Sequence, residues 1–150
     1  MISQDGTALL CDYGLTPINS NPLFTLAATP GVAGSSRWLA PELIEPPENP
    51  SKRITESKPA DVFAFGMLAV EVFTGQVPFP ALMNGSVVIQ IVKGGRPAKP
   101  EAAERLGLTA EMWTFIKQCW SADPKKRPTM DEVATAWEGF ASAYVVVSSW

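Results

Sequence analysis

The 150-residue sequence contains no histidine, only two cysteines and a formal net charge of −3. Without an imidazole ring, Ser-His-Asp and Cys-His nucleophiles and histidine-bearing zinc sites are excluded. Cys11 and Cys119 are too few for a structural zinc site or a disulfide framework, which favours a reducing, intracellular and cytoplasmic location. The mildly acidic balance provides no electrostatic footprint for nucleic acid or an anionic membrane. Any catalysis would use carboxylates, hydroxyls or lysines.

Long apolar runs are absent as well. The densest one, residues 62–73, is interrupted by Gly66 and Glu71, and it is shorter than the roughly 20 residues that span a bilayer. Residues 1–6 have neither the basic stretch nor the apolar core of a signal peptide. We therefore expect no secretion signal and no membrane segment.

The sequence does contain enough apolar residues for a core, because 46% of them are hydrophobic. Residues 60–74 are apolar on nearly every face, which predicts a central helix that ends at Gly75. Two shorter helices are predicted at residues 40–44 and 87–92, the second ended by glycines.

Two further helices carry capping signals. Thr109 precedes apolar residues at helical spacing, so we expect it to cap a helix. Thr129 and Glu132 have the S/T-x-x-E spacing of a capping box, and a second amphipathic stretch follows them. The C-terminal part of the chain is therefore predicted to be helical.

The N-terminal part has a different pattern. Asp5-Gly6 favours a tight turn, and the short apolar run at residues 8–11 completes a predicted β-hairpin. Residues 12–57 are rich in Pro, Gly, Ser, Asn and Thr, and an irregular segment of this length is usually functional or mobile. The predicted fold class is mainly α with a small N-terminal β-hairpin, in a single domain.

Four short motifs follow one another along the chain. Each alone is a weak signal, and a simple turn explains the first adequately. In order, they are Asp12-Tyr13-Gly14, then Gly34-Ser35-Ser36-Arg37-Trp38-Leu39-Ala40-Pro41-Glu42, then Asp61-Val62-Phe63-Ala64-Phe65-Gly66, and finally Cys119-Trp120 with Asp123-Pro124-Lys125-Lys126-Arg127-Pro128-Thr129. All four motifs in this order are far less expected by chance than any one of them alone.

With these motifs the sequence resembles the eukaryotic protein kinases, and within them the tyrosine-kinase-like serine/threonine group. The resemblance covers nearly the whole chain and implies the C-terminal part of the large lobe of this α+β family fold. It implies a partial kinase domain at residues 1–143, an activation segment at 12–42 and a tail at 144–150. The parent activity would be ATP-dependent phosphorylation of protein serine or threonine, with ATP and Mg²⁺ as cofactors and a protein as substrate or partner.

The resemblance assigns the cofactor site to Asp12, Tyr13 and Gly14, which match the D-F-G motif. Asp12 would supply a carboxylate oxygen to Mg²⁺, and its alternative interpretation is a turn residue. Tyr13 stands where the family usually has Phe, so its hydroxyl needs water or a partner when it is buried.

Structural roles are implied for six residues. Glu42 would form an ion pair with Arg127, which ties the end of the activation segment to a distant turn; two solvated charges are the alternative. Asp61 would accept backbone N–H groups of the catalytic loop, or would act only as a negative charge at a helix N-terminus. The remaining three are Ala40 and Pro41, beside Glu42, and Gly66, at the end of the Asp61 motif.

Four hydroxyl residues in the implied activation segment are candidate phosphorylation sites, because a phosphate there could order the loop through a nearby arginine. They are Thr25, Thr29, Ser35 and Ser36. Ser35 stands where relatives often have a Thr that shapes the substrate-docking loop, so a positional role is its preferred interpretation.

The parts of a kinase that hold ATP and activate the substrate hydroxyl have no counterpart in these 150 residues. A Gly-rich loop, a strand lysine and the catalytic-loop aspartate are all missing, so no catalytic residue is assigned and ATP and Mg²⁺ are not expected to bind well. Two explanations remain: a truncated serine/threonine kinase, which we favour, or a noncatalytic pseudokinase-like module that binds partners. For the chain alone we expect marginal stability or association, with Phe63 and Met67 exposed beside Leu10 and Tyr13 and with Asp61 buried; a stable monomer would favour the independent module.

Overall fold

The computed structural model describes residues 3–7, 36–44 and 58–147, with side chains up to residue 142. In these ranges the helical elements are α2 (Pro41–Ile44), α3 (Lys58–Thr74), α4 (Asn84–Val92), η2 (Glu104–Leu106), α5 (Ala110–Cys119), η3 (Pro124–Lys126) and α6 (Met130–Val147). The described part of the chain contains no strand. Its architecture is therefore helical, as predicted.

The described residues contain a turn at the predicted N-terminal hairpin, but they do not show the hairpin itself. Ser3 donates its backbone N–H to the Thr7 carbonyl at 2.9 Å, and Gly6 adopts a φ of 85° that suits glycine. The expected second strand, at residues 8–11, lies outside the described residues.

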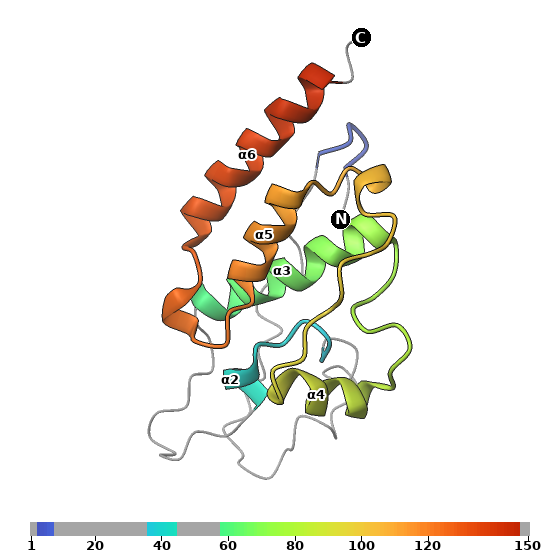
Figure 1. The fold of residues 1–150 in the computed structure, drawn as a ribbon. Helices are drawn as coiled ribbons and strands as arrows, with labels where there is room; N and C mark the ends of the chain where they lie inside the picture. The colour runs from blue at the N-terminus through green and yellow to red at the C-terminus, as the bar shows by residue number, and fades with distance from the viewer. Residues whose placement is uncertain (1–2, 8–35, 45–57, 148–150) are drawn as a thin grey trace.

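Helix α3 occupies the centre of the molecule (Figure 1). Helices α5 and α6 and the turn η3 pack against it, and α2 packs against α4. The chain leaves α3 at Gly75, which has a φ of 65° and donates its N–H to the Glu71 carbonyl at 2.7 Å. The predicted central helix is confirmed, including its end.

The exposure predicted for two α3 residues is wrong. Phe63 and Met67 are both 0% exposed and belong to the main core cluster. Asp61 was expected to be buried at a cost in free energy, but it is exposed in the first turn of α3. The exposed apolar side chains of α3 are instead Leu68, at 48%, and Val72, at 71%.

The predicted capping signals are present. The Thr109 side chain accepts the Met112 backbone N–H at 3.2 Å at the start of α5. At the start of α6, Glu132 accepts the Thr129 backbone N–H at 2.7 Å and returns its own N–H to the Thr129 hydroxyl at 3.2 Å. This reciprocal pair is a capping box.

Gly66 permits a close approach between α3 and α5. A Cβ at this position would lie 3.1 Å from the Cys119 Cβ and 3.5 Å from the Ile116 carbonyl. The preceding residue, Phe65, has its ring edge-on to Trp137 of α6, with centroids 4.9 Å apart. Helix α3 thus contacts α5 through a glycine and α6 through aromatic rings.

Among the described residues, no helix is long and apolar enough to cross a membrane.

Candidate functional site: the anchor of the Ala-Pro-Glu segment

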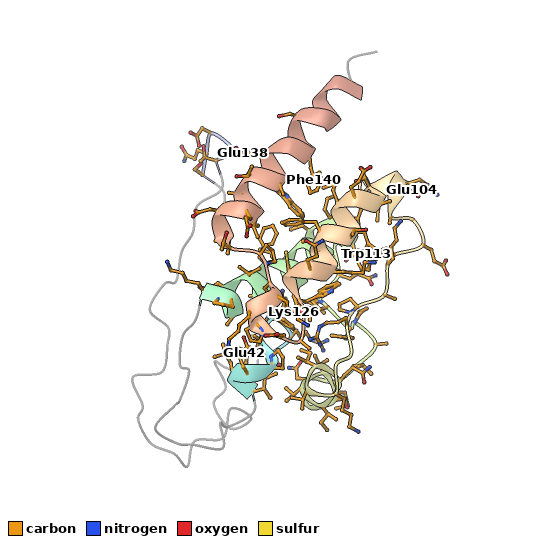
Figure 2. All side chains as sticks on the ribbon, turned by 60° about the vertical axis from the view of Figure 1, so that its left-hand side comes forward. Glu42, Glu104, Trp113, Lys126, Glu138 and Phe140 are labelled. Atoms are coloured by element: carbon orange, nitrogen blue, oxygen red, sulfur yellow. The ribbon has the colours of Figure 1, made fainter. Side chains whose placement is uncertain are left out.

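Glu42 and Arg127 form a bidentate ion pair. Arg127 Nη1 donates to Glu42 Oε1 at 2.6 Å, and Nη2 donates to Oε2 at 2.9 Å. Figure 2 shows Glu42 on α2, close to the turn that carries Lys126. The planar guanidinium matches the carboxylate fork, as the resemblance implied. The expected pair is therefore present in the fold.

Arg127 is held by more than this carboxylate. Its side chain is 0% exposed, its Nε donates to the Ser121 carbonyl at 2.9 Å, and Nη1 also donates to the Pro59 carbonyl at 2.9 Å. The same guanidinium thus joins α2, the first turn of α3 and the residues before η3. Buried charges are tolerated where they are paired and hydrogen-bonded in this way.

A second arginine lies beside this pair. The guanidinium groups of Arg96 and Arg127 lie over the Phe63 ring, 4.9 and 5.1 Å from its centroid, which is within cation–π range. Arg96 donates to the carbonyl of Trp120 at 2.9 Å and to two carbonyls near the end of α4. Burial, and then the charge of Arg127, lower the pKa of Arg96, while Glu42 acts in the opposite direction. Arginine nevertheless stays protonated.

Arg37 and Trp38 attach the residues ahead of α2 to the rest of the fold. The indole N–H of Trp38 donates to Glu71 Oε2 at 3.1 Å, which connects this segment to α3. Arg37 reaches the loop between α3 and α4, where its acceptors are three backbone carbonyls and one side-chain oxygen. They are Pro78 O at 2.7 Å, Phe79 O at 2.8 Å, Leu82 O at 2.6 Å and Asn84 Oδ1 at 3.1 Å.

The anchor comprises Arg37, Trp38 and Glu42, with their partners. These three side chains bind the α3–α4 loop, α3 and Arg127 respectively. Residues 36–44 are thereby fixed along their length. An arrangement of this kind holds a segment in place; it does not itself supply a nucleophile or a base.

Several predicted site residues cannot be placed, because they lie outside the described residues: Asp12, Tyr13, Gly14, Thr25, Thr29 and Ser35. Ser36 is described and is 7% exposed. Ala40 is 0% exposed and Pro41 begins α2. The described residues contain no cluster of three or more metal-ligating side chains, and Asp12, the expected Mg²⁺ ligand, is not among them.

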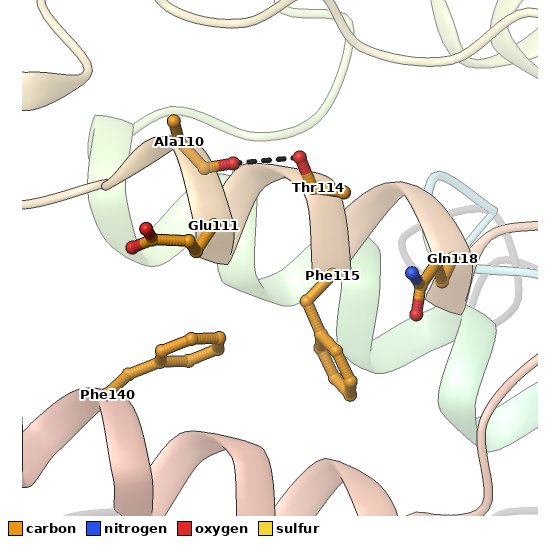
Figure 3. Close-up of a pocket in the computed structure, with 6 residues that line it drawn as sticks. All are labelled: Ala110, Glu111, Thr114, Phe115, Gln118 and Phe140. Atoms are coloured by element: carbon orange, nitrogen blue, oxygen red, sulfur yellow. Dashed lines mark hydrogen bonds between the residues drawn. The ribbon is translucent and has the colours of Figure 1, made fainter.

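One hollow on the described surface lies away from the anchor, between α5 and α6 (Figure 3). It has a volume of about 340 Å³ and is lined by Ala110, Glu111, Thr114, Phe115, Gln118 and Phe140. The Thr114 hydroxyl donates to the Ala110 carbonyl within α5 at 2.9 Å. The hollow is therefore an apolar surface feature, separate from the residues that hold Glu42.

Residues 1–136 match the family model for protein tyrosine and serine/threonine kinases. The chain is 30% identical over 142 residues to tyrosine-protein kinase Src64B of Drosophila melanogaster, covering 94% of this chain and 24% of that one. It is 34% identical over 134 residues to a putative serine/threonine-protein kinase/receptor R831 of Acanthamoeba polyphaga mimivirus, covering 89% and 7%. It is 30% identical over 154 residues to human dual specificity mitogen-activated protein kinase kinase 7, covering 100% and 34%.

A protein with this helical arrangement and this family match is a protein kinase-like chain. It belongs to the protein tyrosine and serine/threonine kinase family. It spans between 7% and 34% of the length of these three relatives, so it corresponds to part of each of them. The predicted family is confirmed.

Sequence analysis missed two of the arginines. The motif that contains Arg37 predicts no role for this side chain, and no motif contains Arg96. The partners of both are mainly backbone carbonyls, which carry no residue-type signature. Two features of the sequence could have drawn attention to these arginines: Arg37 directly precedes Trp38, and Arg96 lies in a Gly-Gly-Arg-Pro sequence.

Proposed function

We propose that these residues form the C-terminal part of the large lobe of a protein kinase that phosphorylates serine or threonine of proteins. The observation that carries this proposal is the bidentate contact of Glu42 with Arg127, at 2.6 and 2.9 Å. It fixes the end of the segment that the resemblance identifies as the activation segment, residues 12–42. The match of residues 1–136 to the kinase family supports it.

In this proposal the described residues form a support. Arg37, Trp38 and Glu42 hold residues 36–44 against three different parts of the helical body. A protein substrate would dock beside the preceding residues, including Ser35, and phosphorylation of Thr25, Thr29, Ser35 or Ser36 would act on the same segment.

ATP would supply the phosphoryl group, and Mg²⁺ would neutralise its developing charge. Asp12, followed by Tyr13 and Gly14, would hold the metal. The 150 residues contain no histidine and no counterpart of the Gly-rich loop, the strand lysine or the catalytic aspartate. We therefore propose that this chain alone does not transfer phosphate, because a single metal ligand does not align a nucleotide with a hydroxyl.

The second candidate is a noncatalytic, pseudokinase-like module that binds other proteins. The burial of Phe63 and Met67, both 0% exposed, favours it, because the chain covers residues that were expected to need cover from elsewhere. A protein partner is proposed in both cases, and a nucleic acid or membrane partner in neither. A cytoplasmic location remains a prediction from the sequence.

Phosphoryl transfer by the purified chain tests the proposal. We expect no radiolabelled phosphate on a general protein substrate with Mg²⁺ and ATP, and the same background with Asp12→Ala. Label that depends on Asp12 would overturn the proposed incompetence. Sequencing the genomic region upstream of Met1 separates the candidates: kinase-like coding sequence there supports a truncated kinase, and an unrelated region supports the independent module.

A further inference from the structure

Arg37 uses its guanidinium in an unusual way for a half-buried arginine. All three of its nitrogens donate to residues 78–84, with two acceptors for Nη1 and one each for Nε and Nη2. The acceptors are oxygens of the loop after α3 and of the first residue of α4. One side chain thus bridges the connection from Pro78 to the first residue of α4.

The loop that Arg37 holds contains a residue in the left-handed region. Phe79 has a φ of 55°, and it is the one non-glycine residue with a positive φ in the described part of the chain. This conformation is costly for a bulky side chain and persists only where its surroundings impose it. The Phe79 carbonyl accepts from Arg37 at 2.8 Å and from the Leu82 N–H at 3.0 Å. The side chains of Phe79 and Leu82 pack against the core.

Arg37 also contacts the residues at the start of α4. Met83 occupies the N-cap position, and its side chain makes no capping hydrogen bond in this described region. Arg37 donates to the Leu82 carbonyl and to Asn84 Oδ1 on either side of Met83, so it holds these two residues without capping the helix N–H groups. A cation is disfavoured at a helix N-terminus. The hydrogen bonds of the Arg37 guanidinium must therefore offset the unfavourable charge. A lysine ammonium cannot reproduce this planar set of donors.

We propose that Arg37 is a positioning residue that couples residues 36–38 to the α3–α4 loop and the first turn of α4. Residues 36–38 and the first turn of α4 are then expected to unfold locally as one unit. The coupling rests on these contacts, and its use in presenting a protein substrate rests on the proposed function. Trp38 and Glu42 hold the same segment to α3 and Arg127, so Arg37 is the link toward α4.

Amide hydrogen exchange of the 150-residue chain tests the coupling. Arg37→Lys keeps the charge and removes the fork. We expect exchange at least tenfold faster in residues 80–92 and unchanged exchange in α5. Arg105→Lys is the matched control, because Arg105 is exposed in η2, and it should leave both helices unchanged. Equal acceleration of α4 and α5, or no acceleration of α4, would overturn the proposal.

Asn84→Ala provides a milder variant that tests the link from its other end. Coupling is reciprocal, so losing one of the four acceptors should accelerate exchange in residues 36–44 without affecting α5. Unchanged exchange in 36–44 contradicts the proposal. Neither measurement involves phosphoryl transfer, so their failure leaves the proposed kinase function untouched, and the phosphate assay in turn does not decide the coupling.

Discussion

Arg127 and Glu42 meet across 85 residues of sequence, with the arginine side chain fully buried and the glutamate side chain 15% exposed. Removing one partner of a buried pair leaves an uncompensated charge. Loss of either partner is therefore expected to be costly, and the contact fixes the geometry of the anchor.

Glu42→Gln should lower the free energy of unfolding by about 3 to 5 kcal/mol, because the buried Arg127 loses its counter-charge. Denaturant titration followed by circular dichroism measures the change. The matched control is Glu104→Gln, which removes an exposed pair with Lys99 at 3.9 Å and should cost less than about 1 kcal/mol. Equal effects of the two variants would show that the Glu42 contact is not buried in solution.

Gly66→Ala should destabilise the protein by about 1 to 3 kcal/mol, because the new methyl group would lie 3.1 Å from the Cys119 Cβ of α5. Gly139→Ala, in α6, has nothing within 4 Å of the added Cβ and should stabilise by about 0.5 to 1 kcal/mol through helix propensity. Thermal unfolding of both variants measures the contrast. A stabilising Gly66→Ala would mean that α3 and α5 are farther apart than described.

Acid should weaken the start of α6. Hydrogen bonds from the backbone N–H and then the hydroxyl of Thr129 hold the pKa of Glu132 below its usual value of 4.5. A lowered folded pKa contributes stability above the unfolded value, and that contribution is lost as the pH falls through the folded value. Melting temperatures of the wild type and Glu132→Gln should therefore differ at a pH above the usual glutamate pKa of 4.5 and converge as the pH falls through the lowered pKa of the folded state. A pH-independent difference would contradict this assignment.

The Cys119 thiol should be inert in the folded protein. Burial raises its pKa to about 12, so the thiol stays protonated at neutral pH. Its exposed fraction is 0%, so a reagent cannot reach the sulfur. In a Cys11→Ser variant, which leaves one cysteine, a thiol reagent at pH 8 should react only at the rate of unfolding. Labelling within seconds under native conditions would place Cys119 at the surface.

The parts of the fold that could be predicted are those with local causes. The caps at Thr109 and Thr129 depend on residues three positions apart, so the spacing alone predicts them. Helix α3 could be predicted as central from its apolar composition, yet the exposure of Phe63 was predicted wrongly. Its ring is covered by the guanidinium groups of Arg96 and Arg127, which composition counts as polar.

The candidate site was predictable only where a motif pairs two side chains. Glu42 with Arg127 followed from the resemblance, because nothing local connects residues 85 apart. The contacts of Arg37 could not be predicted, because three of the four acceptors are backbone carbonyls of a loop that contains the left-handed Phe79. Periodicity carries no information about such a loop.

A double-mutant cycle between Glu42 and Arg127 tests the central claim, that a buried pair anchors the end of the Ala-Pro-Glu segment as in a kinase large lobe. Glu42→Gln, Arg127→Gln and the double variant would be unfolded by denaturant. We predict a coupling free energy of about 2 to 3 kcal/mol, at the upper end for residues in direct contact. Additive single effects, with a coupling below about 0.5 kcal/mol as for independent sites, would contradict the account.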